Sequence, residues 1–457
     1  MSAAGCTARR WATPCAWVAL LGAALAVRAG WLPALARHGW EGHEAEYLEV
    51  FRGTWQGTWS SRVMPLLGWC YRGLGLAADS DLTLVGFSLA VSLLAIAALV
   101  HLVRREAGPL AGWIAGGLVA LHGNHAFWSS SAYNVILPHM LLLAGLALLG
   151  RPGCGRCLVS GLCLGLGVGG RIEIAALLPA ALPFLRWQAW SGRVAWAGAL
   201  VAVSVPALRP LVTPGAHPPG LGGELLPALA QNAWPPLYLA PWDRPVPLAL
   251  AAALAVLGLR WRPRAALPLI LLLLLGHLSA ACFADSGYRH ALASGVALCG
   301  LQGLGLAALL ARARDCEGRA RRLFGAAAAA AFLGVLAPLL ADTAEVARRY
   351  YAPSEEIIAE LRASAPGSWE PADGAGCRAL VTTPARLLGE DGPLEVARGH
   401  GCWLWEEDWQ HLRWTSLGVH DRAVRVHRLF HPIPLGMRQD PSDPGRPPRL
   451  VWRIERP

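Results

Sequence analysis

Long apolar runs separated by short polar connections are the feature that most constrains how this chain can fold. Hydropathy locates about eleven such runs, several near the ~20 residues that cross the hydrocarbon core of a bilayer. They lie at 14–35, 82–103, 108–122, 132–150, 157–170, 172–185, 194–208, 246–259, 265–283, 291–311 and 323–341. Only 15% of the residues are charged, whereas a soluble protein has about 25%. The sequence therefore predicts an all-α polytopic protein whose membrane domain spans residues 1–341.

The first run resembles a signal peptide at its start, because Arg9 and Arg10 precede it. It continues through Trp31 and Leu35 without a clean small-residue cleavage site. We therefore expect an uncleaved first span.

The arginines predict an orientation. If the runs alternate from a cytosolic N-terminus, the inner connections receive 16 Arg and the longer outer connections only 8, with Arg28 inside the first run and in neither count. This bias agrees with the positive-inside rule, and it places the loop 36–81 and the C-terminal region outside.

Abundant Ala, Gly and Pro without any Lys suggest a GC-rich bacterial genome. We expect a multi-pass protein of the bacterial inner membrane. Because the arginines flank apolar runs and form no single patch, the net charge of +10 does not indicate a nucleic-acid partner.

Composition changes after the last run. From Asp342 onward charges, Pro and Trp are frequent and apolar stretches are short. The pattern predicts a helix over 355–361 and strands over 378–382, 423–429 and 449–454. We interpret 342–457 as a small α+β extracytoplasmic domain.

The loop 36–81 contains the first residues that indicate chemistry. Four carboxylates lie close together in it, followed by apolar and aromatic residues at roughly helical spacing. The carboxylates are Glu41, Glu44, Glu46 and Glu49. Such spacing is typical of short amphipathic helices lying in a membrane interface. The alternative is that these glutamates are solvated charges paired with a neighbour such as Arg52.

Three motifs carry a family resemblance. The first is His43-Glu44-Ala45-Glu46-Tyr47 followed by Pro65-Leu66-Leu67-Gly68-Trp69, the second runs from Gly167 to Pro179, and the third is Tyr288-Arg289-His290. Over residues 10–340 the chain resembles the GT-C membrane glycosyltransferases, in the branch of protein O-mannosyltransferases and lipid A aminoarabinose transferases. The chain departs from that pattern at His43, which stands where the family commonly has Asp, and at the single Pro65, where it has Pro-Pro.

The resemblance implies a hexosyl- or pentosyltransferase. Such an enzyme passes a sugar from a polyprenyl-phosphate carrier to a glycan, lipid or protein acceptor at the outer face of the membrane. Its chemistry needs a carboxylate to accept the acceptor's proton and cationic groups to stabilise the departing lipid phosphate. We expect Glu44 to be the base, with Glu46 and His43 as the other catalytic candidates.

Five residues are candidates for substrate binding. Arg62, Arg171 and Arg289 each offer a guanidinium to the phosphate, since this group stays charged near lipid. Arg171 could instead pair with Glu173, and Arg289 with Asp285. Tyr288 belongs to the third motif.

His125, in the loop after the third apolar run, is the fifth candidate, for polar contact with a sugar. We expect no cofactor. The alternative is a divalent cation held by His122, Asn124 and His125 with the loop glutamates.

A transporter or flippase of a lipid-linked substrate is the alternative function, although we find neither the internal repeat nor the deep charges typical of secondary transporters. An inactive assembly protein is a third interpretation.

Overall fold

The structure is a computed structural model that describes residues 3–29, 70, 81–129, 135–208, 245–282, 292–351, 402–405, 425–431 and 449–455. The chain divides into two compact units. The first comprises Met1–Ala29 and Tyr47–Ala344, and the second comprises Gly30–Glu46 and Glu345–Pro457. The predicted domains 1–341 and 342–457 stay a prediction.

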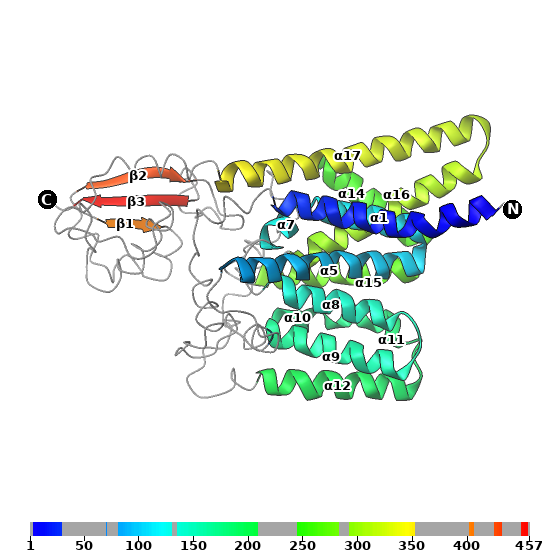
Figure 1. The fold of residues 1–457 in the computed structure, drawn as a ribbon, viewed down its shortest axis with the longest axis horizontal. Coiled ribbons are helices and arrows are strands. Elements are labelled where there is room, and N and C mark those ends of the chain that lie inside the picture. The colour runs from blue at the N-terminus through cyan, green and yellow to red at the C-terminus, as the bar shows by residue number, and fades with distance from the viewer. Residues whose placement is uncertain are drawn as a thin grey trace. The chain divides into compact units, whose positions relative to one another are not determined.

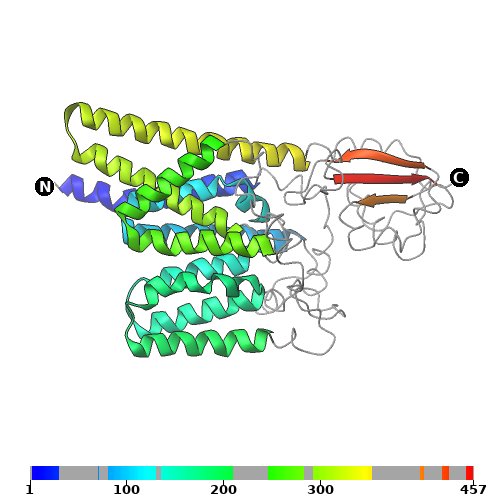
Figure 2. The ribbon, with the colours of Figure 1, turned by 180° about the vertical axis from the view of Figure 1, so that it is seen from behind.

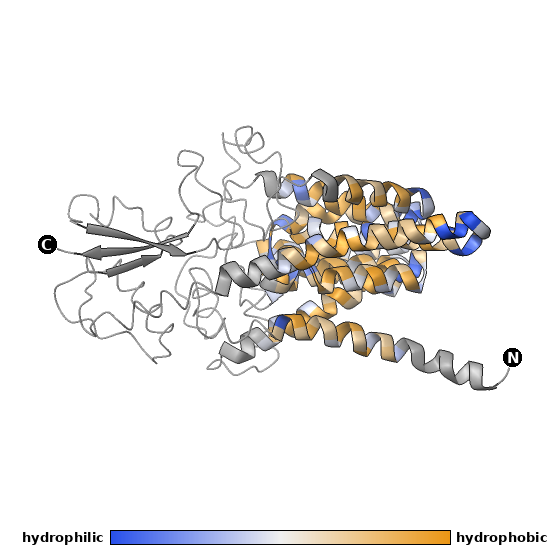
Figure 3. Cartoon of the chain, turned by 90° about the horizontal axis from the view of Figure 1, so that it is seen from above, coloured by the Kyte–Doolittle hydropathy of each residue, from blue (hydrophilic) through white to orange (hydrophobic). Residues whose placement is uncertain are grey.

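The first unit is a bundle of α-helices (Figure 1). Its main helices are α1 (Ala3–Ala29), α5 (Asp81–Ala107), α6 (Pro109–Ala120), α7 (Gly123–Ser129), α8 (Ile136–Leu149), α9 (Cys154–Gly170), α12 (Trp190–Leu208), α14 (Pro245–Trp261), α15 (Pro263–Cys282), α16 (Leu292–Asp315) and α17 (Gly318–Tyr351). Their hydropathy is high along most of their length (Figure 3). Every predicted apolar run overlaps a helical segment. Within the described residues, three segments are long and apolar enough to cross a membrane, namely Gly86–Ala107, Leu292–Asp315 and Gly318–Ala341. The count of about eleven spans stays a prediction.

The run at 172–185 is a broken helix. It consists of α10 (Glu173–Leu177), the 3-10 helix η1 (Leu178–Ala181) and α11 (Leu182–Leu185). Pro179 and Pro183 are the second residues of the second and third pieces. Because proline has no N–H to continue a helical ladder, two prolines four residues apart divide the segment.

Short connections gather at one end of the bundle, where α1 begins (Figure 1). They join α5 to α6, α8 to α9, α11 to α12, α14 to α15 and α16 to α17. Gly108 has φ 93° and Gly318 has φ 59°, a region that side-chain-bearing residues rarely adopt. These glycines let α5 and α16 end abruptly before α6 and α17 begin. Arginines flank all these connections, and we call this end the arginine end. The opposite end is the loop end.

Helix α16 forms the centre of the bundle. It is buried from Leu292 to Ala308 and packs against α6, α14 and α15. Figure 2 shows α14, α15 and α16 from behind. A Cβ added at Gly303 would lie 2.8 Å from the Ala115 nitrogen, and one at Gly305 would collide with the Leu254 carbonyl. Small residues therefore let the helix backbones approach closely, as in other membrane bundles.

The second unit contains a three-stranded antiparallel sheet of β1 (Cys402–Trp405), β2 (Arg425–His431) and β3 (Arg449–Glu455), with β3 in the middle (Figure 1). The strands predicted at 423–429 and 449–454 overlap β2 and β3. The strand β1 was missed, since its four residues CWLW show no alternation. The predicted helix 355–361 and strand 378–382 lie outside the described residues.

Candidate active site

The short helix α7 lies at the loop end of the bundle. Helix α7 follows α6 after a single turn and packs against α1, α5, α6, α8 and α16. Its polar side chains Asn124 and His125 are 2% and 1% exposed, and His122 in the turn before it is 1% exposed. Burying polar groups is costly unless they are hydrogen-bonded. The described contacts of this helix therefore decide what it can do.

One of these contacts joins α7 to Arg28, in the last turn of α1. Arg28 is 0% exposed. Its Nη1 donates to the Ala24 carbonyl at 2.8 Å and to the Ala120 carbonyl at 3.0 Å. Its Nη2 lies 2.7 Å from His125 Nδ1. Because a guanidinium can only donate, His125 Nδ1 must accept, which places the imidazole proton on Nε2. One buried arginine thus links α1, the end of α6 and α7.

The electrostatics of His125 agree with a neutral imidazole. Complete burial lowers the pKa of His125 well below its usual range, and the positive charges of Arg28, His122 and His139 lower it further. Burial in a low-dielectric interior disfavours the charged form of histidine. His125 therefore stays neutral at physiological pH.

Two further histidines complete the surroundings of α7. The His122 ring packs so closely against α16 that a Cβ added at Gly295 would lie 2.8 Å from His122 Nε2. His139, in the first turn of α8, bonds through Nδ1 to the Val135 carbonyl at 2.7 Å. The Thr343 hydroxyl donates to the Leu121 carbonyl at 2.6 Å, which ties α17 to the turn before α7. The loop end is thus fixed by polar contacts from several helices.

Arg171 lies directly after α9, at the same end of the bundle. Its Nε donates to Glu173 Oε2 at 2.5 Å and its Nη2 to Glu173 Oε1 at 2.7 Å. The two side chains are 10% and 14% exposed. Such a two-pronged pair fixes the guanidinium plane. Of the two roles expected for Arg171, the internal pair with Glu173 is present, and contact with a lipid phosphate stays a prediction.

Only two of the eight predicted site residues, Arg171 and His125, fall where the structure gives side-chain positions. The others lie outside the described residues: His43, Glu44, Glu46, Arg62, Tyr288 and Arg289. Within the described part of the chain, no group of three His, Cys, Asp or Glu could hold a metal ion. The alternative cation site needs Glu44 and Glu46, which lie outside the described residues, so it stays untested.

Sequence reasoning missed Arg28. The signal was present, because an arginine inside an apolar run is costly and indicates a specific partner. Its partner could not be identified, since His125 lies 97 residues away in the sequence. Only the packing of α1 beside α6 and α7 brings the two together.

Comparison with known proteins supports the fold. No protein-family model and no curated protein sequence matches the chain. Among solved structures, apo ArnT from Cupriavidus metallidurans matches 97% of this chain and 98% of its own, with 14% identity and a TM-score of 0.51. ArnT bound to undecaprenyl phosphate matches 95% and 97%, with 13% identity and a TM-score of 0.48. An Archaeoglobus fulgidus oligosaccharyltransferase tethered with an acceptor peptide matches 84% of this chain and 60% of its own, with 12% identity and a TM-score of 0.48.

The likeness to apo ArnT, a lipid A aminoarabinose transferase, is one of fold. It extends over nearly the whole of both chains, so the resemblance to GT-C glycosyltransferases that the three motifs indicated is confirmed at the level of architecture.

Proposed function

We propose that this chain is a membrane glycosyltransferase that moves a hexosyl or pentosyl group from a polyprenyl-phosphate carrier to an acceptor at the outer face of the membrane. The observation that carries the proposal is the fold shared with apo ArnT over 97% of the chain. Because a fold alone does not define an activity, the chemistry rests on the residues at the loop end and in the loop 36–81.

The reaction is a displacement at the anomeric carbon. An acceptor hydroxyl attacks that carbon, the bond between the sugar and the phosphate oxygen breaks, and the lipid phosphate leaves with the bonding electrons. Glu44 accepts the hydroxyl proton, with Glu46 or His43 as its substitute. Arg62, Arg171 and Arg289 stabilise the negative charge that develops on the phosphate, and Tyr288 contacts the donor.

Arg171 suits this role because of how it is held. The carboxylate of Glu173 fixes its guanidinium at a nearly buried place at the loop end. A preorganised cation in a low-dielectric place stabilises developing charge more than a solvated one does. Glu173 thus acts as a positioning residue for Arg171.

His125 has a narrower role. Its Nδ1 accepts from Arg28 and its side chain is buried, so contact with a sugar oxygen requires the Nε2–H edge to become accessible. Arg28 sets that tautomer, and it anchors α7 against α1 and α6. We therefore assign Arg28 as a positioning residue for His125.

The test is sugar transfer by the full chain in proteoliposomes. Polyprenyl phosphates carrying radiolabelled hexose or pentose serve as donors, and lipid, glycan and peptide acceptors are compared. A transferase puts label on an acceptor and releases polyprenyl phosphate. A transporter or flippase instead moves the intact donor across the bilayer, and an assembly protein does neither. Either of the last two results would overturn the proposal.

A pair of variants then tests the phosphate site. Arg171→Gln should reduce transfer by at least about a hundredfold, the cost of removing one preorganised charge donor. Arg319→Gln makes the same chemical change at an exposed position at the start of α17, so it should leave transfer within about twofold. Equal activity of the two variants would remove Arg171 from the site.

A further inference from the structure

The arginine end carries more positive than negative charge, although carboxylates such as Glu106, which pairs with Arg105, also lie there. In the described segments 151–208 and 245–282, seven exposed arginines sit at this end, and the one carboxylate, Glu173, lies at the loop end. The arginines are Arg151, Arg156, Arg186, Arg193, Arg260, Arg262 and Arg264. Such a cluster attracts anions at the membrane surface.

Two of these arginines share one tryptophan ring. Arg186 and Trp187 lie in the turn between α11 and α12, and Arg264 lies near the start of α15. The Cζ atoms of Arg186 and Arg264 both lie 4.6 Å from the Trp187 ring centroid. Trp187 is itself 54% exposed. Stacking on an aromatic ring orients a guanidinium while its N–H groups stay available in the ring plane. One ring thus contacts guanidiniums from two separate segments of the chain.

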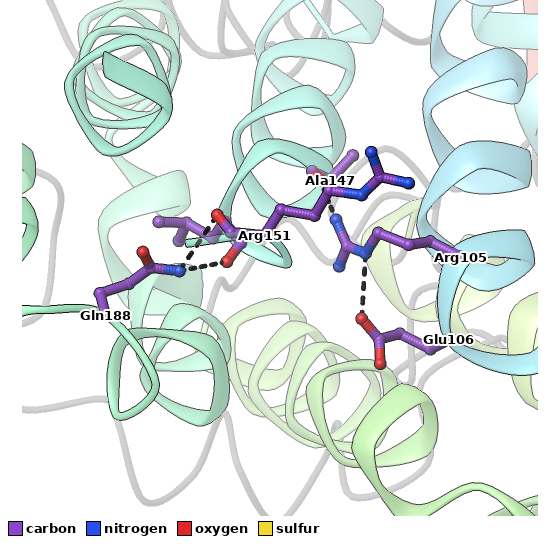
Figure 4. A network of polar contacts seen from close by, with 6 residues as sticks. Arg105, Glu106, Ala147, Arg151 and Gln188 are labelled. Carbon is purple, nitrogen blue, oxygen red and sulfur yellow. Dashed lines mark hydrogen bonds and ion pairs between the residues drawn. The ribbon is translucent and has the colours of Figure 1, made fainter. Parts of the chain in front are cut away.

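The turn that carries this ring is held firmly. Buried Gln188 donates from Nε2 to the Leu149 carbonyl at 2.7 Å and to the Arg151 carbonyl at 3.4 Å (Figure 4). Its Oε1 accepts from the Gly153 N–H at 3.3 Å. One side chain therefore fastens the turn between α11 and α12 to the connection between α8 and α9. We call Arg186, Trp187 and Arg264 the platform. Because its turn is fixed in this way, the platform loses little entropy when it binds a ligand.

Exposed apolar side chains lie on the segments that carry the platform. Leu182 begins α11, Val194 lies in the first turns of α12, and Leu267 lies in the first turns of α15. Exposed tryptophan at the boundary between charged and apolar surface is typical of the membrane interface. This surface suits a ligand with an anionic head and hydrocarbon chains better than a free anion.

We propose that Arg186, Trp187 and Arg264 form a binding site for the headgroup of an anionic phospholipid in the leaflet at the arginine end. The two guanidiniums bind the phosphate, Trp187 lies at the level of the glycerol, and the acyl chains run along the exposed apolar side chains. Guanidiniums are well matched to phosphate oxygens because they can donate two parallel hydrogen bonds. The site lies at the opposite end of the bundle from the proposed donor site, and it does not depend on the proposed activity.

The test is native mass spectrometry of the delipidated full chain released from detergent. The probes are dioleoyl phosphatidylglycerol, dioleoyl phosphatidylcholine and water-soluble glycerol 3-phosphate. Arg186→Gln/Arg264→Gln is compared with Arg319→Gln/Arg321→Gln, which removes the same charge from exposed positions on α17. The first pair should weaken phosphatidylglycerol binding at least about tenfold more than the second, since it removes two charge-assisted forks.

A charge-preserving variant guards against loss of folding. Arg186→Lys/Arg264→Lys keeps the charge and loses the planar fork, so its binding should fall between wild type and the glutamine variant. Equal weakening in both glutamine variants would reduce the site to general surface charge and overturn the proposal. Equally tight binding of phosphatidylcholine would also overturn it, and so would equally effective competition by glycerol 3-phosphate.

Discussion

Replacing Arg171 by Met should destabilise the bundle measurably. Two charge-assisted hydrogen bonds, at 2.5 and 2.7 Å, join Arg171 to Glu173. Removing one partner of a buried ion pair costs about 3–5 kcal/mol, because the remaining charge loses that partner. The side chains are 10% and 14% exposed, so some water reaches Glu173 and the lower end applies. We expect a loss of about 3 kcal/mol, which is about a hundredfold in the unfolding equilibrium constant.

The assay is SDS-induced unfolding of the purified chain in detergent micelles, followed by circular dichroism. Arg171→Met/Glu173→Gln removes both charges, so it should recover most of the loss and lie within about 1.5 kcal/mol of wild type. Arg319→Met, at an exposed site, should change the free energy of unfolding by less than about 0.5 kcal/mol. A single variant that costs less than about 1 kcal/mol, or a double variant no better than the single, would refute the reasoning.

Three more predictions follow from the described contacts. Gly305→Ala should lower the free energy of unfolding by about 1–3 kcal/mol, because its Cβ would meet the α14 backbone. Gly325→Ala has open space around the new Cβ, so it should raise the free energy of unfolding by up to about 1 kcal/mol through helix propensity. SDS-induced unfolding compares the two variants, and equal effects would contradict the packing of α16 against α14. Because the pKa of His125 is lowered in the folded protein, the unfolded state binds a proton at a higher pH than the folded state does. The free energy of unfolding should therefore fall by about 1.4 kcal/mol per pH unit below about pH 6.5. His125→Asn should lose this slope when unfolding is measured over a pH series, and a slope that persists would contradict the lowered pKa. Arg28→Met should lower kcat more than it raises KM for the donor, because His125 and the Ala120 carbonyl lose their hydrogen bonds to Arg28. A variant with wild-type kcat would contradict the positioning role of Arg28.

The helical segments of the bundle were predictable from local sequence, and the buried polar contacts were not. Apolar runs such as 292–308 specify helices by themselves, because the backbone hydrogen bonds of a helix all form within the segment. Arg28 and His125 meet only through packing between residues 97 positions apart, and no local pattern encodes that distance. Arg171 and Glu173 are two residues apart, so their pairing was among the expected outcomes.

The break at Pro179 and Pro183 shows an intermediate case. Hydropathy places 172–185 among the spans, yet prolines at these positions interrupt the helical hydrogen bonds. The two prolines are visible in the sequence and indicate a break, whereas the hydropathy of the same residues indicates one continuous span. The catalytic candidates in the loop 36–81 rest on motif resemblance alone, and they stay predictions.

The most direct test of the central claim compares two glutamates of that loop. Glu44→Gln and Glu49→Gln make the same chemical change five residues apart, and only Glu44 belongs to the motif. The measurement is transfer of radiolabelled sugar from a polyprenyl-phosphate donor by each purified, correctly inserted variant and by wild type. The glycosyltransferase account predicts that Glu44→Gln lowers transfer by about 10²–10⁴-fold, as expected for loss of a general base, while Glu49→Gln stays near wild type. Transfer by Glu44→Gln equal to that of Glu49→Gln, or no transfer by wild type from any donor, would contradict the account.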